Sequence, residues 1–171
     1  MVRRGTQHWD GTQALDFLQD DGGRAAAGYK GSAGDCVARS VAIASGKPYA
    51  EVYAVLAEGT GEQRATKRGK RAASARNGIS VKRKWFRDYM HSLGFTWVPT
   101  MRIGQGCKTH LLRGELPNGR LVVSVSKHYT AVIDGVIHDT HDPTRATIWY
   151  DDFGKTKSMT HRCVYGYWQI V

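Results

Sequence analysis

The spacing of hydrophobic residues changes along the chain, from a helical period in the first half to strand-like runs in the second. Between residues 36 and 93 the apolar side chains recur mostly every three or four positions, which predicts amphipathic helices. From residue 121 onward they gather in short runs rich in valine and isoleucine, which are typical of β-strands. Helices followed by an antiparallel sheet predict an α+β fold.

The helical periods have clear boundaries, most of which are set by glycine or proline. Gly46 stops the helix that starts at residue 36, and Pro48 suits the first position of the next one. The first 34 residues form an otherwise irregular, glycine-rich lead-in that contains one short helical pattern. The predicted helices are 12–19, 36–45, 48–59 and 82–93.

The strand-like runs include one strong hairpin signal, Asp134-Gly135, which lies between two apolar stretches. Counting outward from a two-residue turn there places His128 and Asp139 on one face of the hairpin. His138 falls on the opposite face, and we do not expect it to be catalytic. The predicted strands are 95–99, 121–126, 128–133, 136–140, 146–150 and 163–170.

Cys36 lies on the first turn of its predicted helix, a position that makes a thiol reactive. Gly31 and Gly34 make the backbone of the preceding turn flexible, and Ser32 or Asp35 can cap the helix. The partial positive charge and free N–H groups of a helix N-terminus favour the thiolate, and they can donate to an oxyanion formed on attack. The alternative is that Cys36 is simply a small buried apolar residue, as free cysteines commonly are.

His128 and Asp139 complete a candidate catalytic set with Cys36. A carboxylate that binds one ring nitrogen of a histidine fixes its tautomer and leaves the other nitrogen to take a proton from the thiol. The assigned roles are nucleophile for Cys36, base and then acid for His128, and orienting group for Asp139. Taken singly, His128 can be a sheet-end histidine and Asp139 a strand-end acid, but the combination of the three residues favours a catalytic role.

The composition of the 171 residues fits one folded domain, with 41% hydrophobic and 23% charged residues. We expect neither a membrane span nor a secretory signal, because no long apolar run is present. Three widely spaced cysteines favour reduced thiols and a cytoplasmic location, in the host cytoplasm if a phage encodes the chain.

The other two cysteines are weaker candidates for chemistry. Cys107 follows a glycine-rich turn but precedes no convincing helix, so it ranks below Cys36 as a nucleophile, and Cys163 lies in a strand pattern and is expected in the core. The chain has no C-x-x-C pair, so no metal is expected, and no cofactor is expected either.

The net charge of +10 is concentrated in one segment. We interpret 59–81 as a flexible basic loop, and no aromatic residue lies between Gly59 and Lys84. This composition fits sequence-independent contact with nucleic-acid phosphates, contact with an acidic protein, or a lid over the site, and a solvated surface loop is the alternative. The basic residues of 62–84 are Arg64, Lys67, Arg68, Lys70, Arg71, Arg76, Lys82, Arg83 and Lys84.

The order of cysteine, histidine and aspartate on helices followed by a sheet resembles the papain-like cysteine peptidase superfamily, and in size its small bacterial and phage members. The matching residues are Gly34-Asp35-Cys36, Lys127-His128-Tyr129 and Asp139. A second resemblance, to a family of uncharacterised phage and prophage proteins, lies in 34–39, 126–128 and 164–168 and implies no activity.

One departure from the papain-like pattern concerns the oxyanion. The superfamily has a glutamine a few residues before its cysteine, and its amide helps to bind the oxyanion. Here that spacing falls on Lys30, and the nearest preceding glutamine is Gln19. Lys30 can donate to an oxyanion or be a solvated loop residue.

The papain-like resemblance implies a cysteine-dependent hydrolase, a peptidase, isopeptidase or amidase that works through a thioester acyl-enzyme. The alternative is a non-catalytic papain-like scaffold that binds nucleic acid or an acidic partner through 62–84. A third possibility is a host-interaction factor that sequesters a partner without turnover.

Overall fold

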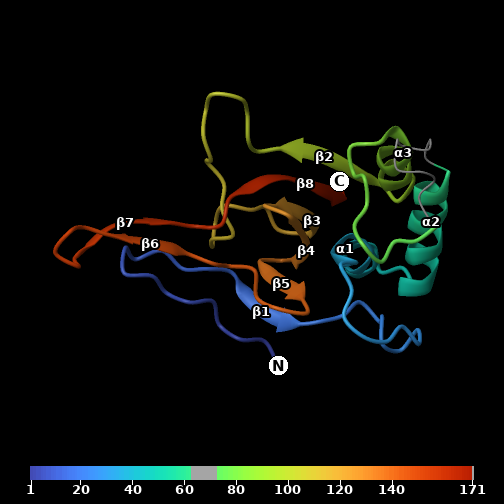
Figure 1. Cartoon of the computed structure of the whole chain (residues 1–171), viewed down its shortest axis with the longest axis horizontal. Coiled ribbons are helices and arrows are strands. Elements are labelled where there is room, and N and C mark those ends of the chain that lie inside the picture. The colour runs from blue at the N-terminus through green and yellow to red at the C-terminus, as the bar shows by residue number, and fades with distance from the viewer. Residues whose placement is uncertain (63–72, 171) are drawn as a thin grey trace.

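The computed structural model describes residues 1–62 and 73–170, which form three helices, a six-stranded sheet and a two-stranded arm (Figure 1). The helices are α1 (Cys36–Ser45), α2 (Tyr49–Gly61) and α3 (Lys84–Ser92). The strands are β1 (Asp16–Gln19), β2 (Phe95–Pro99), β3 (Arg120–Val125), β4 (His128–Ile133), β5 (Val136–Asp139), β6 (Thr147–Tyr150), β7 (Thr156–Thr160) and β8 (Val164–Ile170). The predicted α+β class is confirmed, with the helices in the N-terminal half.

The large sheet is mixed rather than purely antiparallel, which corrects the prediction. Its strand order is β1-β5-β4-β3-β8-β2, and β1 runs parallel to β5 while every other neighbouring pair is antiparallel. The reason lies in the N-terminal segment: β1 joins the edge of a sheet whose other strands come from the second half of the chain.

The helix predicted at 12–19 is therefore wrong. Leu15 and Phe17 are buried on either side of the half-buried Asp16, which is the period of a strand, and Phe17 pairs with Ile137 of β5. Pairing with a strand far along the chain overrides the short helical pattern. The lead-in of 1–34 thus contributes one strand to the sheet.

The predicted helices 36–45, 48–59 and 82–93 are present with small changes at their ends. Pro48 is the residue before α2 rather than its first residue, and α2 continues to Gly61, two residues beyond its predicted end and inside the segment interpreted as a loop. The described helices are too short and too polar for any of them to cross a membrane.

The Asp134-Gly135 hairpin has the predicted register. Ile133 pairs with Val136, and Ala131 pairs with His138. Asp134 and Gly135 both have positive φ, 47° and 78°, as the tight turn between right-twisted strands requires. The preceding turn, between β3 and β4, also takes two residues, and Lys127 in it has a φ of 55°.

Two hydrophobic clusters hold the sheet in place. The larger one joins buried side chains of α1, α2 and α3 to Val122, Ala131 and Trp168 of the sheet. The smaller one joins Leu121 and Val123, which alternate with Val122 along β3, to residues of β1, β4 and β5. Figure 1 shows the helices at one end of the molecule and the β6–β7 arm reaching out from the other.

Candidate active site

Cys36 is the first residue of α1 and is only partly buried. Asp35 occupies the N-cap position, yet its side chain makes no capping hydrogen bond. Its carboxylate instead accepts hydrogen bonds from Arg24 Nε at 2.8 Å, from Tyr49 Oη at 2.5 Å and from Arg39. The Asp35 side chain therefore belongs to a buried ionic cluster instead of capping the helix. Because it does not accept hydrogen bonds from the N–H groups at the start of α1, those groups can bind a negative charge.

His128 and Asp139 are brought together as the hairpin register predicts. His128 Nε2 lies 2.6 Å from Asp139 Oδ2, and the Asp139 side chain is only 3% exposed. The backbone N–H of Thr140 donates to the other carboxylate oxygen at 2.7 Å, which fixes the carboxylate orientation. The ring of His128 also packs near that of His141, with 5.0 Å between ring centroids.

Cys36 and His128 lie close enough to shift each other's pKa, so the three predicted residues come together in one site. Burial by itself raises the pKa of Cys36, but the hydrogen bond with His128, the backbone N–H of Tyr129 and the positive charges of His128 and Arg39 outweigh it, and the pKa lies below its ordinary value. These contacts favour a thiolate at the start of α1.

The same contacts act on the imidazole in the opposite direction. Burial lowers the pKa of His128, but its hydrogen bonds with Asp139 and Cys36 raise it to about 9. The pKa of Asp139 is lowered because the hydrogen bond and positive charge of His128 outweigh its burial. A thiolate beside an imidazolium is the state that these three shifts describe.

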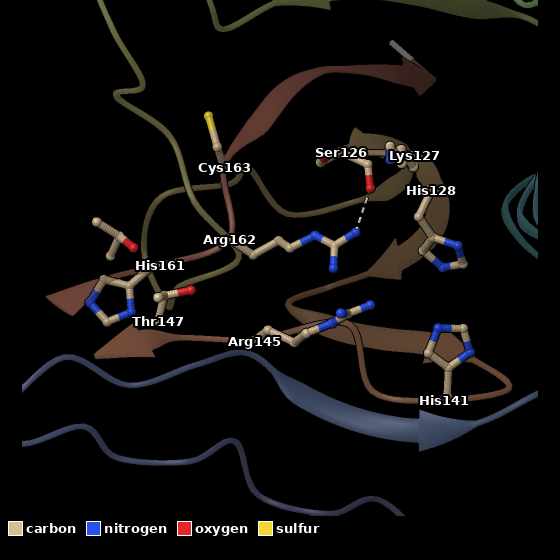
Figure 2. A pocket seen from close by; sticks show the side chains of 10 residues that line it. Ser126, Lys127, His128, His141, Arg145, Thr147, His161, Arg162 and Cys163 are labelled. Atoms are coloured by element: carbon tan, nitrogen blue, oxygen red, sulfur yellow. Dashed lines mark hydrogen bonds between the residues drawn. The ribbon is translucent and has the colours of Figure 1, made fainter. Parts of the chain in front are cut away.

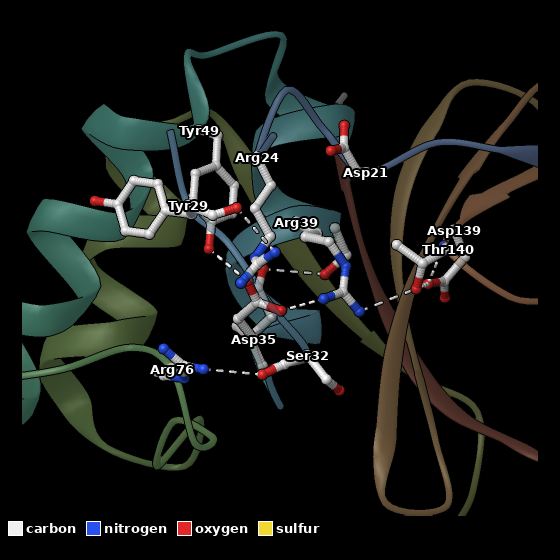
Figure 3. Close-up of polar contacts among 12 residues, drawn as sticks. Asp21, Arg24, Tyr29, Ser32, Asp35, Arg39, Tyr49, Arg76, Asp139 and Thr140 are labelled. Carbon is white, nitrogen blue, oxygen red and sulfur yellow. Dashed lines mark hydrogen bonds and ion pairs between the residues drawn. The ribbon is translucent and has the colours of Figure 1, made fainter. Parts of the chain in front are cut away.

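Arg39 connects the triad to the ionic cluster of Asp35 (Figure 3). It lies one turn along α1 from Asp35, and its second terminal nitrogen is 3.9 Å from Asp139 Oδ1. Its Nε is buried and has no hydrogen-bond partner among the described residues. Sequence reasoning missed Arg39, although its spacing of four residues from Asp35 on a predicted helix was an available signal.

Neither residue considered for the oxyanion is held toward the thiol. Lys30 is exposed, and it is its backbone carbonyl oxygen that is engaged, by Arg24 at 3.2 Å. Gln19 ends β1, pairs in register with Asp139 and is also exposed. Two backbone groups lie closer to the chemistry: the N–H of Cys36 at the start of α1 and the N–H of Tyr129 on the sulfur.

Cys107 and Cys163 form a disulfide, which corrects the expectation of reduced thiols and of Cys107 as a rival nucleophile. Backbone pairing explains why these distant residues meet. Leu111 N–H donates to the carbonyl oxygen of Arg162, and Val164 N–H donates to that of Thr109. The 100–119 connection therefore runs beside the start of β8, and Cys36 is the one free cysteine of the chain.

The basic segment is described only in part. Arg64, Lys67, Arg68, Lys70 and Arg71 lie outside the described residues. Lys82, Arg83 and Lys84 are exposed at the start of α3, where Lys84 pairs with Asp88 at 2.7 Å. The stretch from 73 to 81 is held to the turn before Cys36, since Ala75 is fully buried and Gly78 N–H donates to the carbonyl oxygen of Gly34.

Two cavities lie on either side of the His128-Tyr129 segment. One, of about 580 Å³, is lined by His128 and by several basic residues around the β3–β4 turn and the start of β8. The other, of about 560 Å³, is lined by Tyr129, Trp97, Trp168 and other residues of the helix α3 side. Trp168 is buried in the larger hydrophobic cluster, while Tyr165 is exposed at the second cavity.

Within the described residues, no group of three or more histidine, cysteine, aspartate and glutamate side chains is arranged to hold a metal ion. Comparison of the chain with protein-family models, curated proteins and solved structures gives no match in any of the three. The functional argument therefore depends on the geometry of the site itself.

Proposed function

We propose that the protein is a cysteine-dependent hydrolase of amide bonds, a peptidase, isopeptidase or amidase with a papain-like arrangement of its site. The observation that carries the proposal is the grouping of three residues: buried Asp139 is hydrogen-bonded to His128, and Cys36, at the start of α1, lies beside that histidine. A thiolate, a histidine held by a carboxylate and free N–H groups at a helix start are the parts that acyl transfer to sulfur requires.

The reaction follows from these parts. The Cys36 thiolate adds to the carbonyl carbon of the substrate, and the resulting oxyanion is stabilised by the N–H groups at the start of α1. The His128 imidazolium gives its proton to the leaving amine as the C–N bond breaks, which leaves a thioester on Cys36. Neutral His128 then removes a proton from water, the hydroxide attacks the thioester, and the acid product and thiolate are released.

Asp139 and Arg39 act through other groups in this scheme. Asp139 binds Nε2 of His128, so Nδ1 is the nitrogen that exchanges protons with the thiol and the substrate. Arg39 carries a permanent positive charge that favours both the Cys36 thiolate and the Asp139 carboxylate. We regard both as positioning residues.

The test is the rate at which iodoacetamide alkylates the protein between pH 5 and pH 10 without reductant. The disulfide leaves Cys36 as the one reactive thiol, so one label per chain is expected and Cys36→Ala should take none. The reaction should be well advanced at pH values where a free thiol, with a pKa of about 8.5, is still protonated. His128→Ala should move the profile toward that value.

Two results would contradict the proposal: labelling that persists in Cys36→Ala, or a pH profile of an ordinary thiol that His128→Ala leaves unchanged. The alternative function, a non-catalytic scaffold that binds nucleic acid or an acidic partner through 62–84, would then lead. It predicts binding that weakens steeply with salt and disappears when the basic residues of 64–71 are neutralised. A factor that only sequesters a partner would keep its function in Cys36→Ala.

A further inference from the structure

The cavity beside His128 carries an unusual excess of positive charge. Lys127, Arg145 and Arg162 line it together with three histidines, one of which is His128 of the triad. Among the described residues that line it, none is acidic. Figure 2 shows the side chains of Arg145 and Arg162 extending into the same space toward His128 and His141.

These charges are not neutralised from outside the cavity. Within the described parts of the chain, Lys127, Arg145 and Arg162 form no ion pair. His161, at the far side, is the exception because Asp10 Oδ2 lies 3.1 Å from its ring. Arg24 and Arg39, by contrast, share the carboxylate of Asp35.

The guanidinium of Arg162 is fixed by one hydrogen bond, while another of its N–H donors has no acceptor among the described residues. One terminal nitrogen donates to the carbonyl oxygen of Ser126 at 2.6 Å, which fixes the guanidinium at the β3–β4 turn. Its Nε is buried and has no hydrogen-bond partner within 1–62 and 73–170. Burial and the neighbouring charge of Arg145 lower the pKa of Arg162, so the two arginines repel each other in the absence of an anion.

We propose that this cavity binds a carboxylate group of the substrate, close to the amide bond that Cys36 and His128 cleave. The inference rests on the proposed hydrolase function and names its substrate class, acidic peptides or amides. A guanidinium group presents paired N–H donors that match the two oxygens of a carboxylate, and two such groups line this cavity. An anion there removes their mutual repulsion, and His128 on the same wall puts the carboxylate near the reacting atoms.

A substrate can supply that carboxylate in two ways, through an acidic side chain or through a free C-terminus. Four small probes separate them. N-acetyl-aspartate α-amide carries the side-chain carboxylate, and N-acetyl-alanine carries the terminal one. N-acetyl-asparagine amide and N-acetyl-alanine amide are their neutral counterparts. Binding is measured by the NMR shifts of the arginine Nε–H groups and the histidine rings on titration.

We expect at least one of the two carboxylate probes to bind and both neutral probes to fail. Arg145→Gln and Arg162→Gln should each weaken binding about tenfold, since each removes a charge-assisted hydrogen bond. Arg102→Gln is the matched control, because Arg102 is an exposed arginine outside the cavity and its loss changes the net charge equally. It should leave binding unchanged.

The probe that binds identifies the source of the carboxylate, and binding of both supports the shared chemistry. Inorganic phosphate is titrated beside the four probes. The inference is overturned if neither carboxylate probe binds, if the neutral probes bind equally, or if phosphate is the only one of the five that binds. It is also overturned if Arg102→Gln weakens binding as much as Arg162→Gln.

The titration is also run on Cys36→Ala, which separates this inference from the hydrolase proposal. Carboxylate binding that persists there, together with an unreactive wild-type thiol, would support the cavity as an anion site while removing the hydrolase proposal. A reactive wild-type thiol with no carboxylate binding would support the hydrolase proposal and overturn the carboxylate site.

Discussion

Asp35 and Asp139 are two buried carboxylates joined by Arg39, and they differ in the kind of partner that faces them. Their side chains are 1% and 3% exposed, and each accepts several hydrogen bonds. Asp35 faces Arg24, Arg39 and Tyr49, whereas Asp139 faces His128.

The difference teaches where proton exchange is possible in this molecule. Arginines keep their charge, and burial together with the hydrogen bond to Asp35 raises the pKa of Tyr49 well above its ordinary value. The Tyr49 hydroxyl therefore keeps its proton near neutral pH, and the cluster of Asp35 fixes the start of α1. His128 does titrate in an accessible range, so the similarly buried Asp139 is hydrogen-bonded to a group that can exchange protons.

The largest expected effect comes from Asp35→Ala, which leaves Arg24 and Arg39 without their shared carboxylate. Removing one partner of a buried ion pair costs about 3–5 kcal/mol, and we expect the free energy of unfolding to fall by that amount. Urea denaturation measures it. Asp88→Ala, which removes an exposed pair with Lys84, should cost less than about 1 kcal/mol. Equal losses in both variants would show that the Asp35 cluster is not structural.

Tyr49→Phe should have the next largest effect, again on stability. It removes the hydroxyl that donates to Asp35 at 2.5 Å, and hydrogen bonds to charged groups contribute about 1.5–3 kcal/mol. Urea denaturation checks this, and the alkylation rate of Cys36 at neutral pH should stay as in the wild type. A large drop in that rate would show that the Asp35 cluster also controls the reactivity of Cys36, which contradicts the separation of the two carboxylates into a structural and a titrating one.

Asp139→Asn should give the opposite pattern, with about 1 kcal/mol lost in stability and a clear change in chemistry. Asp139 raises the pKa of His128, so an amide there should lower it from about 9. The stability that protonated His128 contributes is present at low pH and is lost as pH rises through about 9 in the wild type, and through a lower pH in the variant.

The measurement for Asp139→Asn is the NMR titration of the His128 ring in both proteins, beside the pH profile of alkylation. Because the proposed reaction uses the imidazolium as the proton donor to the leaving amine, any hydrolysis found should decline at alkaline pH near the pKa of His128, and at a lower pH in the variant. An unchanged His128 titration would contradict the assigned role of Asp139.

His138→Ala should have the smallest effect. His138 pairs with Asp20 at 3.0 Å on a partly exposed surface, so we expect a stability change of about 0.5 kcal/mol or less and no change in Cys36 alkylation. Slower alkylation in this variant would refute the hairpin register as a guide to which histidine acts.

The elements that could be predicted from the sequence are those with local signals. The apolar spacing after Cys36 gave α1 with its observed bounds, and the turn Asp134-Gly135 gave a register that brings His128 to Asp139. Both depend on neighbouring residues only, which is why counting along the chain is sufficient.

The parts that could not be predicted depend on contacts between distant segments. The strand β1 takes its conformation from pairing with β5, and the disulfide of Cys107 and Cys163 depends on backbone pairing of the 100–119 connection with β8. The basic cavity likewise combines Arg145, Arg162 and His128, which lie far apart in sequence and belong to no shared motif.

The disulfide gives the molecule one further property, its behaviour when the chain is cut. The crosslink encloses residues 107–163, so the β6–β7 arm, His128 and Asp139 all lie within one covalent ring. A protease that cleaves once in the exposed arm leaves both pieces attached, and the nicked protein runs as a single species on a gel without reductant. Adding a reductant splits it into two fragments, with Cys36 and His128 both on the N-terminal one.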